Sequence, residues 1–405
     1  MTPIADTAGV RAGNTARVLR EVRAHGQTTR VDLASALNLS PATVTAVVGA
    51  LLESGLVLEE RAASSPGRGR PRVLISLNPD ARYVAGAKLN DGSLTTAILN
   101  FKGEILAEAA APFDQPTIDG DLLRAKVDEA LDAALCIAGL TENQIDAYGL
   151  GVPGFVETES GLCHWSPVLS VEDKAVDVGA MLRERLSCPT FVDNDANLVA
   201  LAELWFGLGN EEQNFLVVTV EHGVGLGIVM DGRLYRGGRG LGAEFGHTKV
   251  QIDGALCRCG QRGCLEAYVA DFALRREAGA ALEGDSTGLS RSEILDRLAA
   301  EARAGKDIPA SIYRRAGRML GLGLANLTNL FDPALIVLAG ERIRNHKLLA
   351  EEVEKTLREN AIVINRESTP LTVHRWGDGL WARGAGALAL DGLMSQADLQ
   401  VQKVA

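Results

Sequence analysis

The sequence predicts an α/β protein in which a small N-terminal unit precedes two larger lobes. Helix patterns and two short strands fill the first 80 residues, strand-turn-strand patterns begin at residue 83, and the same strand and helix order recurs from residue 215. At 405 residues the chain is too long for one ordinary core. We expect domains at 1–80, 81–195 and 196–381, with a C-terminal helix over about 382–400 completing the first lobe.

Charge is divided unevenly between these parts. The whole chain carries −11, but residues 1–80 hold nine Arg and no Lys against seven acidic residues, which leaves +2 there and −13 in the remainder. Only the N-terminal unit therefore suits a phosphate backbone. No apolar run reaches the roughly twenty residues of a membrane span, and the first residues lack the apolar segment of a signal peptide. We expect a cytoplasmic protein without a membrane partner.

The first 54 residues have the pattern of a helix-turn-helix. Apolar residues at helical spacing predict helices over 14–24 and 29–37. A tight turn follows, with Ser40 as N-cap and Pro41 at the first position of a third helix. Small and hydroxyl side chains on one face of this helix could approach base edges in a major groove. These candidate DNA contacts are Ala42, Thr43, Thr45 and Ala46. A helical bundle without a DNA role is the alternative.

A wing is predicted next to the third helix. Residues 56–59 and 72–77 have the composition of two strands joined by the loop 61–71. This loop alternates Gly and Arg, so it is thin enough to enter a minor groove, where Arg is favoured. We expect Arg68, Arg70 and Arg72 to contact DNA, and a solvated linker is the alternative. Together the segments predict a winged helix-turn-helix domain that binds double-stranded operator DNA.

The remainder of the chain repeats one order of elements. In each half, three strands joined by tight turns are followed by a helix and then a buried strand. The repetition predicts two lobes of related topology, and an unrelated pair of α/β domains is the alternative. The first set covers 83–89, 94–99, 104–109, 123–138 and 148–152, and the second covers 215–220, 225–230, 233–235, 313–330 and 335–339.

One His and three of the six Cys lie close together in the sequence. His247 is followed after nine residues by Cys257, Cys259 and Cys264. One imidazole and three thiolates form a closed tetrahedral set of the kind that binds structural Zn²⁺. We therefore expect zinc as a structural cofactor. A cluster of reduced core cysteines is the alternative.

These residues carry a resemblance to a known family. LGAEFGH at 241–247, followed by CRCGQRGCLEAY at 257–268, resembles the signature of the ROK family of repressors, open reading frames and sugar kinases. GVPG at 151–154 and VDNDAN at 192–197 match further motifs of that family in the same order. The resemblance implies a two-lobed actin-like (hexokinase/RNase H-like) sugar-kinase fold. The N-terminal extension is similar to the regulator branch, of the xylose repressor and N-acetylglucosamine repressor type.

The resemblance also implies a sugar site. In the family, the position of Asp195 is the base that deprotonates the hydroxyl being phosphorylated. Carboxylates suit a polyol because adjacent hydroxyls both donate and accept hydrogen bonds. His247 could offer one ring nitrogen to the metal and the other to the sugar. We expect a monosaccharide or sugar derivative as effector. The positions that match sugar-binding residues are Asn194, Asp195, Glu244, His247 and Glu266.

Both phosphate-binding loops depart from the kinase pattern. Family kinases carry Asp-x-Gly-Gly-Thr where this chain has Lys88 to Ser93, and Gly-Thr-Gly-x-Gly where it has Glu221 to Gly225. Lys88 takes the position of an acidic residue that could bind magnesium, and Glu221 brings negative charge to the place of the phosphates. We expect no catalytic residues and no enzymatic activity, so that the site recognises sugar without phosphoryl transfer.

The predicted function is therefore that of a sequence-specific transcriptional regulator, a repressor of carbohydrate-metabolism genes. We expect a homodimer or homotetramer that docks paired helices on a two-fold-related operator. Three alternatives stay open at this point: control by a partner protein instead of sugar, an active sugar kinase, and an activator. The sequence specifies neither the sugar nor the operator.

Overall fold

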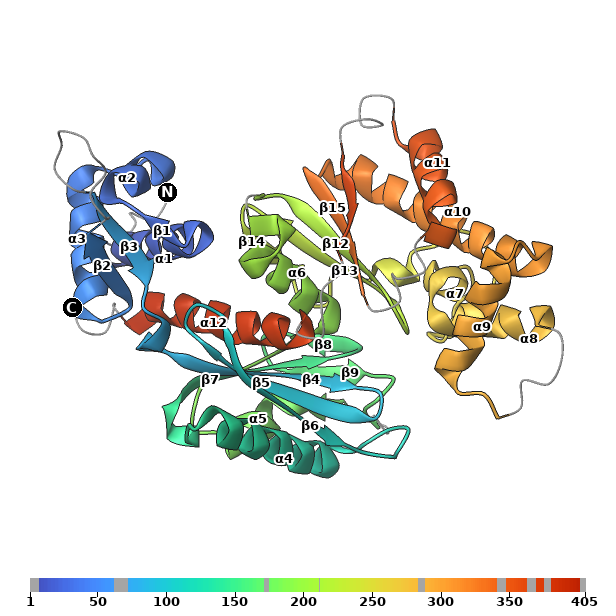
Figure 1. Cartoon of the computed structure of the whole chain (residues 1–405), viewed down its shortest axis with the longest axis horizontal. Coiled ribbons are helices and arrows are strands. Elements are labelled where there is room, and N and C mark those ends of the chain that lie inside the picture. The colour runs from blue at the N-terminus through green and yellow to red at the C-terminus, as the bar shows by residue number, and fades with distance from the viewer. Residues whose placement is uncertain are drawn as a thin grey trace. The chain divides into compact units, whose positions relative to one another are not determined.

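The computed structural model describes residues 7–61, 72–170, 175–210, 212–282, 288–340, 347–362, 369–374 and 380–400 (Figure 1). For residues 7–12 and 395–400 only the backbone is described. The chain divides into two compact units. The first is Met1–Glu211 with Gly379–Ala405, and the second is Glu212–Asp378.

Three helices and a small sheet form the N-terminal domain. The sheet has the order β1-β3-β2 within the described residues, and all of its pairs are antiparallel. Val18 and Val22 of the first helix are buried with Leu33 of the second and Val44 of the third. The predicted helix-turn-helix and the two predicted wing strands are confirmed. The elements are α1 (Thr7–His25), β1 (Gln27–Thr28), α2 (Arg30–Leu37), α3 (Pro41–Glu53), β2 (Val57–Arg61) and β3 (Val73–Leu77).

Local hydrogen bonds fix the ends of α2 and α3. Asn38 ends α2 with a left-handed φ of 50°, a conformation that Asn tolerates better than most residues. Ser40 then caps α3, because its Oγ accepts a hydrogen bond from the Thr43 N–H at 3.1 Å. Pro41 occupies the first turn, as the sequence predicts. No single described helix is long and apolar enough to cross a membrane, and α2 with α3 passes that test only as a pair bent by 119°.

A mixed sheet forms the core of the rest of the first unit. Its order is β11-β7-β4-β5-β6, with β5 antiparallel to its two neighbours and the other pairs parallel. Helix α4 covers one face, and α12 crosses the other (Figure 1). The elements are β4 (Tyr83–Asn90), β5 (Ser93–Asn100), β6 (Ile105–Pro112), α4 (Gly120–Ala138), β7 (Ile145–Val152), β8 (Phe155–Glu157), β9 (Leu162–Trp165), β10 (Val176–Asp177), α5 (Val178–Arg185), β11 (Thr190–Asn194), α6 (Asp195–Phe206) and α12 (Leu380–Gln400), with short turns η1 (Pro79–Ala81), η2 (Glu142–Gln144) and η3 (Leu208–Asn210).

The second unit has a sheet of the same topology. Its order is β14-β13-β12-β15-β16, and the sense of each pair matches that of the corresponding pair in the first sheet. The prediction of two related α/β lobes is confirmed. The elements are β12 (Phe215–Val220), β13 (Val224–Met230), β14 (Arg233–Tyr235), η4 (Phe245–His247), α7 (Glu266–Val269), α8 (Asp271–Ala281), α9 (Arg291–Arg303), α10 (Asp307–Phe331), β15 (Leu335–Ala339), α11 (Ala350–Asn360) and β16 (Leu371–Val373).

Helix α12 lies against the first sheet at backbone contact distance. A Cβ atom added at Gly86 of β4 would lie 2.2 Å from the Gly386 nitrogen, and one at Gly149 of β7 would lie 2.3 Å from the Ala385 oxygen. Gly384 contacts α6 in the same way, 2.5 Å from the Leu198 oxygen. The C-terminal helix therefore belongs to the first unit. Helix α6 belongs to it too, although the sequence prediction assigns residues from 196 onward to the second lobe.

Substitution of Gly149 by Ala tests this contact. The new methyl group would overlap the α12 backbone, so we expect Gly149→Ala to lower the free energy of unfolding by about 3 kcal/mol. Gly13→Ala is the control, because no atom lies within 4 Å of a Cβ at this position in α1. Thermal unfolding followed by calorimetry measures both variants, and equal melting temperatures would contradict the described packing.

Candidate functional site

The candidate DNA-binding face lies at the N-terminal end of α3. Ala42, Thr45 and Ala46 are exposed there. Thr43 is half-buried, and its Oγ1 lies 2.8 Å from Ser40 Oγ within the cap of the helix. Thr45 Oγ1 donates to the Pro41 oxygen at 2.8 Å, so its hydroxyl hydrogen is used inside the helix and an acceptor and a methyl group are left for contact.

The wing is described only in part. Arg72 is exposed just before β3. The other two predicted DNA contacts of the wing, Arg68 and Arg70, lie outside the described residues. Arg30 of α2 forms an ion pair with Glu59 of β2, which ties the helix-turn-helix to the strand that leads into the wing.

The turn between β11 and α6 holds the first two predicted sugar-binding residues. Asn194 caps α6, since its Oδ1 accepts a hydrogen bond from the Ala196 N–H at 2.8 Å. Its Nδ2 donates to the Gly154 oxygen at 2.6 Å, which ties this turn to the GVPG segment after β7. Asp195, the first residue of α6, is half-buried. Both amide atoms of Asn194 are thus engaged by the protein, and Asp195 is the carboxylate that this turn presents.

Sequence reasoning overlooked the role of Asp193 in this turn. Its side chain is completely buried, and Oδ1 accepts hydrogen bonds from the Asn194 N–H at 2.8 Å and from Asn197 Nδ2 at 2.7 Å. A buried carboxylate is tolerated when such donors surround it. Asp193 therefore fixes the geometry of the turn. The signal was in the sequence, where an acidic residue follows Phe191 and Val192 within the strand β11.

The other predicted sugar-binding residues lie in the second unit. Glu266 is buried at the start of α7, and its Oε2 accepts a hydrogen bond from the Val224 N–H at 3.3 Å. Its Oε1 lies 3.8 Å from Cys257 Sγ. Glu244 is exposed and directly follows Ala243, whose φ of 67° is unusual for a residue other than Gly. Such strained backbone is found at ligand sites more often than elsewhere. The structure thus brings Glu266 close to the cysteine cluster.

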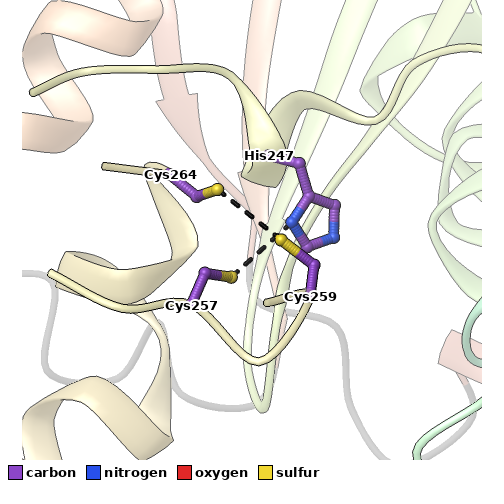
Figure 2. A group of neighbouring side chains, drawn as sticks. All are labelled: His247, Cys257, Cys259 and Cys264. Carbon is purple, nitrogen blue, oxygen red and sulfur yellow. Dashed lines mark hydrogen bonds between the residues drawn. The ribbon is translucent and has the colours of Figure 1, made fainter. Parts of the chain in front are cut away.

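His247, Cys257, Cys259 and Cys264 form a cluster that could hold a metal ion (Figure 2). One ligand atom from each residue lies within 4.8 Å of all the others. Cys257 Sγ is 3.7 Å from His247 Nδ1, and Cys259 Sγ is 3.7 Å from Cys264 Sγ. Cys257 and Cys264 are buried, whereas Cys259 is exposed. Four residues that the sequence predicts as ligands therefore come together as a set.

The glycines between these cysteines allow the chain to turn tightly. Gly260 and Gly263 both have positive φ, of 83° and 77°. A Cβ at Gly263 would lie 1.8 Å from the Gln251 oxygen, so no larger residue fits there. The loop therefore brings Cys259 back toward Cys264.

Electrostatics in the cluster differ from one ligand to the next. Burial raises the pKa of the Cys257 thiol to about 12 and lowers the pKa of His247. Burial also opposes ionisation of Cys259, but hydrogen bonds to its sulfur, first from the Gln261 N–H, outweigh burial and lower its pKa. Lys249 Nζ lies 2.9 Å from Cys264 Sγ, and this hydrogen bond raises the pKa of Lys249. A cation among the sulfurs would favour the ionised form of every thiol.

Arg258 was also overlooked by sequence reasoning. Its Nη2 lies 3.6 Å from Glu266 Oε1 and also donates a hydrogen bond to the His222 oxygen. The guanidinium lies 4.3 Å from the centre of the Phe272 ring. Arg258 therefore links the loop of the cysteine cluster to the Glu266 carboxylate and to the chain at His222. Its position between Cys257 and Cys259 was the available signal.

The end of β4, where the sequence predicts an altered phosphate loop, holds a lysine against an aromatic ring. Lys88 is buried near the end of β4, and its Nζ lies 3.0 Å from the centre of the Trp381 ring in α12. Such contacts stabilise an ammonium group that has lost much of its water. At 221–225, where the sequence predicts the other altered phosphate loop, the Glu221 N–H donates to the Gly223 oxygen at 2.9 Å, so the chain turns sharply there.

Comparisons with known families agree with this architecture. Residues 91–392 match the ROK family, and residues 13–57 match a winged helix-turn-helix DNA-binding family. The chain belongs to the ROK family. The family that the sequence motifs suggested is confirmed, and so is the DNA-binding domain at the N-terminus of this ROK protein.

Known relatives include regulators of similar length. The DNA-binding transcriptional dual regulator NagC of Escherichia coli (strain K12) is 29% identical over 392 residues, which cover 95% of this chain and 94% of NagC. A solved ROK family transcriptional regulator, a homolog of the E. coli MLC protein, has a TM-score of 0.80 at 26% identity and covers 97% of this chain and 100% of its own. The ROK hexokinase of Thermus thermophilus has a TM-score of 0.64 at 30% identity and covers 77% of this chain and 99% of its own.

Removing the Asn194 side chain tests its structural role. Asn194→Ala removes the helix cap and the hydrogen bond to the Gly154 oxygen, so we expect a loss of about 1 to 2 kcal/mol in the free energy of unfolding. Asn143→Ala, in the exposed turn η2, is the control and should change stability by less than about 0.5 kcal/mol. Calorimetry compares the two. A loss at Asn194 no larger than at Asn143 would show that the cap does not support this turn.

Proposed function

We propose that this ROK protein is a repressor whose affinity for operator DNA is controlled by a sugar, and that it does not transfer phosphate to that sugar. One observation carries the proposal. A winged helix-turn-helix domain and an intact carboxylate turn at β11–α6 occur in the same compact unit. Full-length relatives are named regulators, and the solved regulator covers 97% of this chain against 77% for the hexokinase.

DNA binding would use the exposed small side chains of α3. Ala42, Thr45 and Ala46 would allow the helix to enter a major groove, where methyl groups contact thymine. Arg68, Arg70 and Arg72 would contact the backbone or the minor groove from the wing. We expect a homodimer or homotetramer on a two-fold-related operator, as for other helix-turn-helix proteins.

Sugar binding would use acceptors that the protein holds in fixed positions. Asp195 starts α6 in a turn fixed by Asp193, and Glu266 is buried beside Arg258. With Asn194, Glu244 and His247 these residues form the proposed sugar set. A fixed carboxylate discriminates the stereochemistry of a polyol because an inverted hydroxyl leaves it without a partner. We propose a monosaccharide or sugar derivative as the effector.

The altered loops argue against phosphoryl transfer. Magnesium needs oxygen ligands, and the end of β4 offers a buried Lys88 ammonium on the Trp381 ring at the position of the kinase carboxylate. Positive charge at this point would repel the metal that normally accompanies ATP. We therefore propose that Asp195 acts as a ligand for a sugar hydroxyl and not as a catalytic base.

We also propose that the metal of the cysteine cluster is structural zinc. Four ligands at Zn–S distances near 2.3 Å are separated by about 3.8 Å along the edges of a tetrahedron. The separations of 3.7 Å between Cys257 Sγ and His247 Nδ1, and between Cys259 Sγ and Cys264 Sγ, fit this geometry. With four protein donors the site is closed, so zinc would hold the loop between η4 and α7 and present His247 and Glu266.

Metal analysis tests the zinc proposal. We expect about one zinc ion per purified chain, and we expect Cys264→Ser to lose most of it and to unfold at a lower temperature, since site formation and folding are coupled. Cys136→Ser is the control, because Cys136 is exposed on α4. Mass spectrometry of the digested protein gives the metal content. Wild-type protein free of zinc after growth with added zinc, or unchanged zinc in Cys264→Ser, would refute this part of the proposal.

A combined screen tests the sugar proposal. Thermal-shift measurements across aldopentoses, aldohexoses, and their N-acetyl and phosphorylated forms identify a binder. That sugar is then titrated into a complex with a duplex selected by the protein from a random DNA library. We expect the sugar to weaken operator binding by a factor of about 5 to 150, the usual range of allosteric coupling. Asp195→Asn should lower the affinity for the sugar and leave the affinity for the operator unchanged.

Each competing function has its own outcome in this screen. No thermal shift with any sugar, together with tight operator binding, would favour control by a partner protein. Production of ADP from ATP in the presence of any sugar would show an active kinase. Tighter operator binding with sugar would contradict the proposed direction of control. Unchanged sugar affinity in Asp195→Asn would remove this carboxylate from the site.

A further inference from the structure

The end of α1 contacts the end of α6. The Arg23 guanidinium lies 4.1 Å from the centre of the Trp205 ring, and Asn210 Nδ2 donates a hydrogen bond to the Ala24 oxygen at 2.8 Å. Trp205 is in the last turn of α6, and Asn210 is in the turn η3 that follows it. Two independent contacts therefore join the DNA-binding domain to one short segment of the first lobe.

The Arg23 side chain is held in an unusual environment. Its Nε and Nη1 are sealed from solvent and have no hydrogen-bond partner among the described residues. Burial lowers its pKa to about 10, and the carboxylate of Asp391 in α12 opposes this shift. The guanidinium remains charged at neutral pH. Its contact with the face of the Trp205 ring and its attraction to the Asp391 carboxylate offset part of the cost of burial. A displaced Trp205 would leave this charge poorly stabilised, so the contact is sensitive to small movements of α6.

Helix α6 is tightly packed along its whole length. Every residue from Ala196 to Trp205 is buried. Gly384 of α12 contacts the Leu198 backbone, and the Phe206 ring fills the space where Gly103 would carry a side chain. Glu203, also buried, accepts a hydrogen bond from the Leu208 N–H at 2.9 Å and so joins η3 to the helix. The 12 residues of α6 span roughly 18 Å, from Asp195 at one end to the contact with α1 at the other.

We propose that α6 transmits the state of the sugar site to the DNA-binding domain, and that the contact of Trp205 with Arg23 is where the domain receives it. This inference rests on the proposed function, because it needs a sugar at Asp195. A sugar hydroxyl bound to Asp195 would pull the first turn of α6 toward the sugar and shift the whole helix. Because α1 packs on α3, a shift at Trp205 and Asn210 changes the position of the recognition helix.

In this mechanism Arg23 and Trp205 are positioning residues, and they touch neither sugar nor DNA. A merely structural role would lower stability and leave the coupling between the two sites intact. A transmitting role would change the coupling while each site keeps its own affinity. Measurement of both affinities and of the coupling separates the two roles.

The first experiment uses the full-length protein and the selected DNA duplex, and no sugar. Hydrogen exchange of residues 195–210 is compared with and without the duplex. In the wild type we expect the duplex to change exchange in this segment, since coupling between sites is reciprocal. In Arg23→Met and Trp205→Leu we expect most of this change to be lost, while the Kd for the duplex stays within about threefold.

The control for Arg23→Met is Arg124→Met. Arg124 lies on α4, pairs with Glu184 at 3.6 Å, and also has a buried Nε without a hydrogen-bond partner among the described residues. The Arg124→Met variant should show the same change in hydrogen exchange on duplex binding as the wild type. If Arg23→Met fails to fold, Asn210→Ala replaces it, because this variant removes only the hydrogen bond to the Ala24 oxygen. A wild-type segment that does not respond to duplex, or variants that respond as the wild type does, would overturn the proposal.

The second experiment adds the sugar found in the thermal-shift screen, with D-xylose and N-acetyl-D-glucosamine as the first probes. We expect the ratio of duplex Kd values with and without sugar to fall from the wild-type value, about fivefold or more, to near one in Arg23→Met. The Kd for the sugar should stay within about threefold. An unchanged ratio would overturn the proposal. A wild-type ratio of one with every sugar would refute the proposed function, and the exchange experiment would still decide the role of α6.

Discussion

The buried hydrogen bonds of the Asp193 side chain hold both ends of the proposed mechanism in place. This side chain fixes the turn after β11 through the Asn194 N–H and the Asn197 side chain, and Asn194 in turn caps α6. That one turn sets the position of Asp195 at the start of the helix and of Trp205 at its end. A buried polar side chain is stable only while its hydrogen bonds are complete, so the turn tolerates little distortion. The proposed sugar contact and the contact with α1 both follow from it.

Most of the fold could be predicted from local patterns. The Ser40 cap, Pro41 after it and the apolar spacing of α3 specify this helix within a few residues of sequence. The repeated order of strands likewise predicts the two sheets, and the His and Cys spacing predicts the candidate metal ligands. These features depend on residues near one another in the chain, or on a repeat that is visible without a structure.

Other features could not be predicted because they join residues distant in sequence. Lys88 meets Trp381, and Arg23 meets Trp205, only after the sheet and α12 are assembled. The double use of the Asn194 side chain, as cap and as donor to the Gly154 oxygen, was also missed, because a family motif gives residue types and not their partners. The same is true of Arg258, whose contact with Glu266 depends on the fold of the loop that carries the cysteine cluster. Three of these features lie at or next to the candidate sites, and the contact of Arg23 with Trp205 lies at the other end of α6 from Asp195.

In the proposed mechanism the sugar site and the DNA-binding domain are joined by helix α6, so that binding at one changes the affinity of the other. Calorimetric titration of the sugar into free protein, and into protein saturated with its operator duplex, tests this claim most directly. We expect weaker sugar binding in the DNA complex, by the same factor by which sugar weakens operator binding. Equal sugar affinity in the two titrations would contradict it.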